Sequence, residues 1–149
     1  METVIKKLTF LNLSNRNIEI LIDVITYLFV LLFVYTAASK LLTISTFIDV
    51  LGKYPVIGKY NTFVGYAVPG IELVISAALI IPFTKRIGLF MSLIIMLLFL
   101  LYIIYMIISG SELPCSCGGI ISKLSWQQHL WFNSVFIVLA GIGIKLSNT

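Results

Sequence analysis

Long runs of apolar residues, separated by short polar stretches, make up most of the chain. No charged residue occurs from Val24 to Ser39, and none occurs from Ile87 to Gly110. The second run covers 24 residues, and an α-helix needs about 20 apolar residues to cross the hydrocarbon core of a bilayer. The pattern therefore predicts helices that span a membrane.

Four such helices are expected, and they form a single membrane domain over residues 1–149. Trp126 and Gln127 extend the last apolar run backwards, so its helix starts in the membrane interface. The predicted fold class is all-α, an integral membrane four-helix bundle. The expected spans are residues 18–39, 62–83, 87–109 and 126–144.

Composition supports a membrane protein and excludes several other classes. Hydrophobic residues make up 60% of the chain and charged residues 11%, whereas an ordinary soluble domain has about 25% charged residues. The basic side chains flank the apolar runs, so they indicate membrane anchoring instead of nucleic-acid binding. The chain has no glycine-rich phosphate loop, no G-x-S-x-G motif and no pair of catalytic carboxylates. The first run lacks an early cleavage pattern and is interpreted as a retained helix.

Lysine and arginine in the short loops predict the orientation of the spans. With the N-terminus inside, six basic residues face the cytoplasm and four face outwards, so we expect both termini to be cytoplasmic and residues 40–61 and 110–125 to be outside. A bacterial inner membrane is the expected location. The six inner residues are Lys6, Lys7, Arg16, Lys85, Arg86 and Lys145, and the four outer ones are Lys40, Lys53, Lys59 and Lys123.

The two cysteines of the chain, Cys115 and Cys117, lie one residue apart in the stretch PCSCGG. On the outer face a disulfide is permitted. A C-x-C disulfide closes a ring of about eleven atoms, which departs from relaxed geometry, and strained, exposed disulfides tend to be labile or catalytic. Ser125 and Gln128 form a capping-box pattern at the start of the next helix, whose N-terminus would favour a thiolate. These features favour redox chemistry.

Two other interpretations of the cysteines stay open. Cysteines in a membrane protein are often inert, small apolar residues. A metal site needs three or four ligands, and the nearby sequence offers His129 and, more weakly, Glu112 besides the two thiols. We expect no metal site.

Polar residues inside the spans are further candidates. A charged carboxylate near the bilayer midplane is expensive, so Glu72 should face the bundle, and Lys40 is its candidate partner in an ion pair. Glu72 serves either to hold helices together or to handle protons. His129 is a candidate for accepting a thiol proton or for contacting a quinone carbonyl, although a histidine beside Trp126 is also typical of an interfacial anchor.

These motifs together resemble the DoxX/MauE group of small bacterial membrane proteins. Its members carry a Pro-x-x-Glu in the second span, which matches Pro69 and Glu72, and the MauE (methylamine utilisation) branch carries a C-x-C after the third span, which matches Cys115 and Cys117. The likeness covers about residues 20–145. It implies disulfide formation in exported proteins beside a thioredoxin-like partner, and a bundle similar to quinone-linked thiol oxidoreductases. The aromatic residue that usually follows the second cysteine is here Gly118.

The sequence thus favours a membrane thiol–disulfide redox protein. Cys115 and Cys117 would exchange with an exported or thioredoxin-like protein, with a membrane quinone as a candidate redox partner near His129. The main rival is a non-enzymatic assembly factor or subunit that uses the C-x-C segment as a docking surface. A small transporter fits less well, because one intramembrane glutamate and no inverted repeat give little of a translocation path.

Overall fold

The protein is a bundle of long helices, as its apolar runs predict. The computed structural model describes residues 1–3, 15–54, 56–109 and 126–148, and these contain helices and no strands. Four helices are long and apolar enough to cross a membrane, so the prediction of an all-α membrane bundle is confirmed. They are α2 (Asn15–Leu42), α4 (Asn61–Ile80), α5 (Lys85–Ile108) and α6 (Trp126–Ser147).

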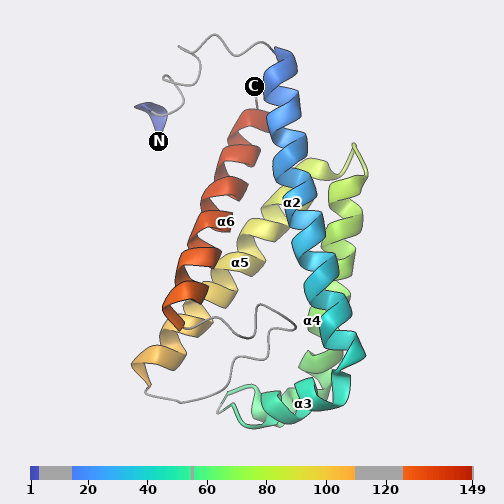
Figure 1. Cartoon of the computed structure of the whole chain (residues 1–149), viewed down its shortest axis with the longest axis vertical. Coiled ribbons are helices and arrows are strands. Elements are labelled where there is room, and N and C mark those ends of the chain that lie inside the picture. Colours follow the sequence, from blue (N-terminus) through green and yellow to red (C-terminus); the bar gives the residue numbers. More distant parts are fainter. Residues whose placement is uncertain (4–14, 55, 110–125, 149) are drawn as a thin grey trace.

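Neighbouring helices run in opposite directions in two closely packed pairs. α2 packs most extensively against α4, and α5 against α6. α2 and α5 descend towards one end of the molecule, while α4 and α6 rise from it (Figure 1). We call this lower end, where α2 finishes and α6 begins, the α3 end, because the short helix α3 (Ile44–Gly52) lies across it.

Helix α3 falls within residues 40–61, which the sequence predicted as an outer loop. Its apolar residues Ile44, Phe47, Ile48 and Leu51 follow the i, i+3, i+4, i+7 spacing of an amphipathic helix, and Phe47 and Leu51 are buried. A 3₁₀ turn over Gly58–Tyr60 leads into α4. The connection between the first two spans is therefore largely helical.

A proline sets the length of the second span. The sequence predicted a span to residue 83, but α4 ends at Ile80. Pro82 disfavours helical geometry at the residue before it, and Ile81 is accordingly extended, with φ −76° and ψ 121°. The turn is closed by Thr84, whose Oγ1 donates to the carbonyl of Ala78 at 2.8 Å.

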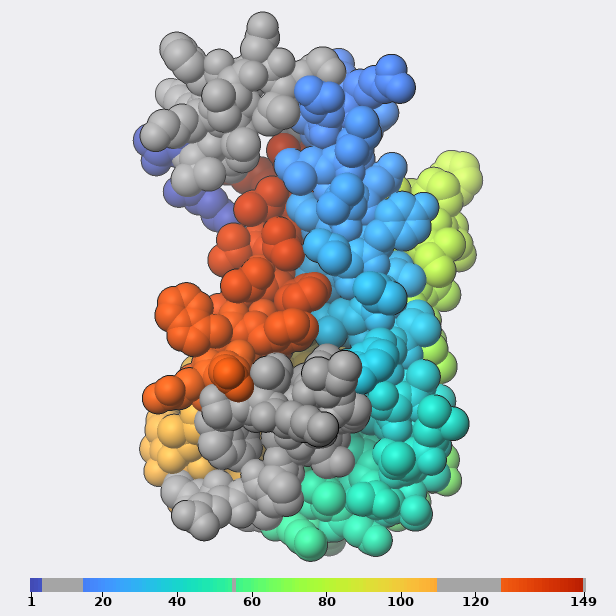
Figure 2. Space-filling view, viewed as in Figure 1, coloured from blue at the N-terminus to red at the C-terminus, as the bar shows by residue number. Residues whose placement is uncertain are grey.

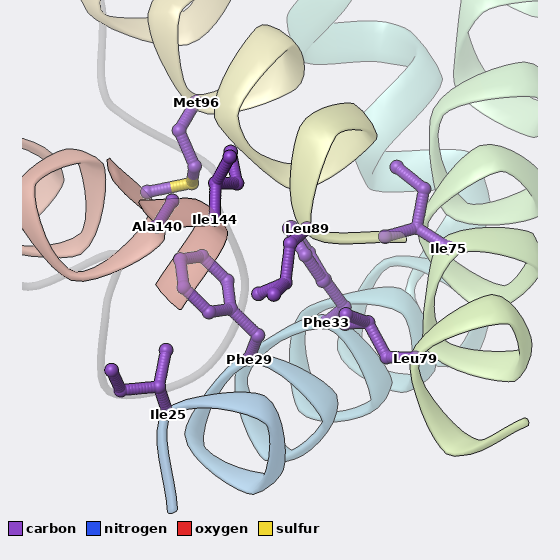
Figure 3. Close-up of a cluster of buried hydrophobic side chains, with 9 residues drawn as sticks. All are labelled: Ile25, Phe29, Phe33, Ile75, Leu79, Leu89, Met96, Ala140 and Ile144. Atoms are coloured by element: carbon purple, nitrogen blue, oxygen red, sulfur yellow. The ribbon is translucent and has the colours of Figure 1, made fainter. Parts of the chain in front are cut away.

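The apolar core lies where all four long helices meet. Phe29 of α2 stacks edge-on against Phe136 of α6, with ring centroids 5.1 Å apart. Figure 3 shows the buried side chains that converge from the four helices. They are Ile25, Phe29, Phe33, Ile75, Leu79, Leu89, Met96, Ala140 and Ile144.

The outer surface of the bundle is apolar. Large hydrophobic side chains such as Tyr27, Leu31 and Trp131 are each at least 70% exposed, and Figure 2 shows α2 and α6 side chains projecting from one face. Such a surface suits lipid acyl chains instead of water. The interior, by contrast, contains the polar side chains described next.

Candidate functional site

A salt bridge lies buried within the membrane-spanning part of the bundle. Lys40 Nζ of α2 is 2.6 Å from Glu72 Oε1 of α4, and the two residues are 5% and 2% exposed. The sequence offered these residues as an ion-pair candidate, and the structure brings them together. The buried face of α4 also carries Pro69, Ser76 and Leu79.

The lysine points into the bundle instead of outwards to the headgroups. Lys40 stands two residues before the end of α2, where a lysine normally extends to the membrane interface. Helical side chains lean towards the helix N-terminus, which for Lys40 is the middle of the bundle. There its ammonium lies 5.9 Å from the ring centre of Phe47 of α3 and 5.7 Å from that of Phe99 of α5. The charge therefore contacts four helices, its own included.

Glu72 retains hydrogen-bonding capacity beyond its salt bridge. Its backbone carbonyl accepts a hydrogen bond from Ser76 Oγ at 2.8 Å. The hydroxyl of Thr36 lies beside the carboxyl but donates to the carbonyl of Phe33 at 3.3 Å. Glu72 Oε2 is buried and has no hydrogen-bond partner in the described part of the chain. A buried polar atom of this kind is unusual in folded proteins and suggests a functional position.

A second buried oxygen of the same kind lies nearer the α3 end. The hydroxyl of Tyr102 on α5 is buried, and no described residue is its hydrogen-bond partner. Tyr102 comes three residues after Phe99, so the two share one side of α5. Its ring meets that of Tyr54 edge-on, with centroids 5.7 Å apart.

Helix α6 adds His129 and Asn133, which are 2% and 7% exposed. The depth of His129 follows from the contact of Phe29 with Phe136, because α2 and α6 run in opposite directions. Thr36 lies seven residues after Phe29, and His129 lies seven residues before Phe136. Seven residues cover about 10 Å along a helix, so Thr36 and His129 lie at about the same depth, nearer the α3 end. Each membrane helix thus contributes polar side chains to the same half of the bundle, a gathering that the sequence did not predict for Asn133 and Tyr102.

The hydroxyls buried in the other half bond to their own helices, as those of Thr36 and Ser76 do. Thr26 Oγ1 donates to the carbonyl of Ile22 at 2.8 Å, and Ser92 Oγ donates to that of Gly88 at 2.7 Å. Near the α3 end, Glu72 Oε2 and the Tyr102 hydroxyl lack a hydrogen-bond partner among the described residues, so they remain able to bind something else.

Comparison with known proteins assigns the chain to a family. The family model described as methylamine utilisation protein MauE matches residues 18–146. The chain belongs to the MauE family. Searches of curated proteins and of solved structures gave no match.

The MauE match includes the C-x-C motif, which lies outside the described residues. Cys115 and Cys117 belong to the segment that joins α5 to α6, and Ser125 of the predicted capping box belongs to it as well. The segment leaves α5 after Ile108 and enters α6 at Trp126, and both points are at the α3 end. In the described part of this MauE-family chain, no group of three His, Cys, Asp or Glu residues is placed to hold a metal ion.

A quinone beside His129 stays a prediction of the sequence. The headgroup would need direct access to the imidazole, and His129 is only 2% exposed. We therefore derive no redox step through a quinone at this position of the MauE fold.

Proposed function

We propose that this MauE-family protein exchanges disulfides with an exported or thioredoxin-like protein through Cys115 and Cys117. The observation that carries the proposal is the C-x-C pair itself, framed by Pro114 and by Gly118 and Gly119. The family match across the pair supports it, because the MauE branch carries a C-x-C at this place. The segment that carries the pair also joins α5 to α6, and both of these helices contribute polar side chains to the half of the bundle near the α3 end. The likeness to DoxX proteins stays a prediction.

The exchange requires no further reactant. A thiolate of the reduced pair attacks a disulfide of the partner, so a mixed disulfide forms and one partner thiolate leaves. The second cysteine then attacks the mixed disulfide and releases the other partner thiolate. The C-x-C pair is oxidised by two electrons, the partner is reduced by two, and two protons follow. The reverse sequence oxidises the partner, and the relative reduction potentials decide the direction.

We further propose that the protein spans a bacterial inner membrane with both termini in the cytoplasm. The distribution of lysine and arginine supports this orientation. Lys40 is buried against Glu72 and is no interfacial anchor, so three basic residues remain on the proposed outer side against six on the inner side. This difference is larger than the one that the sequence suggested.

A membrane-impermeant maleimide tests the orientation. We expect it to label Cys115 or Cys117 in intact cells after mild reduction, because the segment between α5 and α6 should face outwards. Labelling is read by a mass shift of the purified protein, with the Cys115→Ser/Cys117→Ser variant as the blank. Labelling that requires broken membranes would reverse the orientation.

Trapping of a mixed disulfide tests the function. Each single variant, Cys115→Ser and Cys117→Ser, keeps one thiol, and the variant that keeps the attacking thiol cannot resolve its adduct. We expect this variant to accumulate a covalent adduct with a thiol protein, which dithiothreitol releases, on a non-reducing gel. If neither variant gives an adduct while a partner still co-purifies with the double Ser variant, the motif is a docking surface instead.

A further inference from the structure

The bundle can be divided into two units, and the contacts between these units differ at the two ends of the bundle. The first unit is α2 with α4 and α3, and the second is α5 with α6. α3 is held firmly on α4, because Asn61 Nδ2 donates to the carbonyl of Ile48 at 3.3 Å. A Cβ added at Gly65 would lie 2.6 Å from Ile48 Cγ1. α3 therefore moves with α4.

Away from the α3 end the two units are in close contact. A Cβ at Gly88 of α5 would lie 3.0 Å from the backbone nitrogen of Leu79 of α4, and one at Gly143 of α6 would lie 3.4 Å from Ile25 of α2. The backbones approach closely at Gly88, whereas the contact at Gly143 is an ordinary van der Waals contact with a side chain. Lys85 and Asp23 add a salt bridge of 2.6 Å between the units. This end is suited to act as a fixed hinge.

At the α3 end the units meet through aromatic rings and through the cation–π contact of one buried lysine. Phe99 of the second unit lies 5.7 Å from the ammonium of Lys40, and Tyr102 lies against Tyr54 of the first unit. Lys40 has a second favourable position, because it stands near the end of α2 and would otherwise extend to the headgroups. The charge of Glu72 holds it inside, since an unpaired ammonium in the hydrocarbon region is expensive.

We propose that Lys40, Phe99, Tyr54 and Tyr102 form a clasp that opens and closes the α3 end of the bundle and so controls access to the Glu72 carboxyl. In the closed state described here, Lys40 binds Glu72 and the ring of Phe99 together. When the carboxyl takes up a proton and loses its charge, Lys40 turns outwards, Phe99 loses its cation, and the second unit swings about the close contact at Gly88 and the Lys85–Asp23 salt bridge. Glu72 Oε2, which is buried without a partner in the described chain, then becomes reachable.

Distances between spin labels test the clasp without reference to thiol exchange. In the Cys115→Ser/Cys117→Ser background, cysteines at two exposed positions, Asp49 of α3 and Gln127 of α6, carry the labels across the α3 end. Double electron–electron resonance should give one narrow distance distribution for the otherwise unchanged protein. The additional change Glu72→Gln, which removes the charge and keeps the shape, should broaden this distribution and lengthen its mean.

Two controls make the outcome decisive. Labels at the exposed positions Glu19 of α2 and Arg86 of α5 report the hinge end, and their distances should stay unchanged in the Glu72→Gln protein. Phe99→Leu removes the ring but keeps an apolar side chain, so it should lengthen the Asp49–Gln127 distance even if Glu72→Gln prevents folding. Unchanged distances in both variants, or equal lengthening at both ends, would overturn the clasp.

Discussion

Replacing Glu72 by Leu should lower the stability of the protein more than any conservative change in its apolar core. The substitution removes the counter-charge of the Lys40 ammonium, which is 5% exposed, so the lysine either stays buried without a partner or gives up its packed position. Breaking a buried ion pair by removing one partner costs about 3–5 kcal/mol. For a chain of this size we expect a fall of about 6–20 °C in the midpoint of thermal unfolding in detergent. Lys40→Met should behave similarly, because it strands the carboxylate.

The double variant Lys40→Met/Glu72→Leu separates charge from packing. It removes both charges and keeps apolar volume, so most of the lost stability should return, and a double-mutant cycle should show strong coupling. Asp23→Asn is the matched control, because it breaks a salt bridge of the same length whose side chains are 28% and 51% exposed. Exposed pairs contribute at most about 1 kcal/mol. Equal losses in Asp23→Asn and Glu72→Leu would show that the burial of the pair does not matter.

The same substitutions decide what Glu72 does. Glu72→Gln keeps the shape and hydrogen-bonding capacity and removes the charge. If Glu72 only holds helices together, the Gln variant should exchange disulfides at the rate of the original protein. If its charge serves the reaction or the clasp, the exchange rate should fall in the Gln variant even where the protein remains folded. Full stability and full exchange in the Leu variant would exclude both roles.

The sequence predicted the membrane helices well because each depends on a local property, the length of an apolar run. The end of α4 was harder to predict, because the prediction depends on recognising that Pro82 disfavours helical geometry at Ile81. Helix α3 did have a local signal in the spacing of Ile44, Phe47 and Leu51. Nine residues between polar flanks are nevertheless easily interpreted as a loop, and the burial of α3 depends on α4.

The candidate site was only partly predictable, for the same reason. The energetic penalty of a charge in lipid pointed to a partner for Glu72, and Lys40 was a candidate within reach. The rings of Phe47 and Phe99 around Lys40 come from segments whose relative depth a single sequence does not specify. Tyr102 resembles any interfacial tyrosine until its neighbours are known. The register between helices is therefore what the structure adds.

Replacing both Cys115 and Cys117 by Ser should abolish disulfide exchange completely and barely change folding. Exchange needs a thiolate, and serine supplies none under these conditions. The disulfide would close so short a loop that it constrains the unfolded chain little, so its loss should move the unfolding midpoint only slightly. Exchange is measured with a purified thiol partner and unfolding with the same preparations.

The reduction potential of the pair provides an independent measurement. Equilibration in glutathione or dithiothreitol buffers of known reduction potential, followed by thiol alkylation, gives the oxidised fraction of the pair at each potential. A C-x-C disulfide is held in a strained ring, so we expect a comparatively oxidising potential, above the range of about −300 mV and lower that is typical of structural disulfides. A potential in the structural range, or full exchange in the double Ser variant, would contradict the redox role. The C-x-C segment would then be better explained as a surface on which another protein docks.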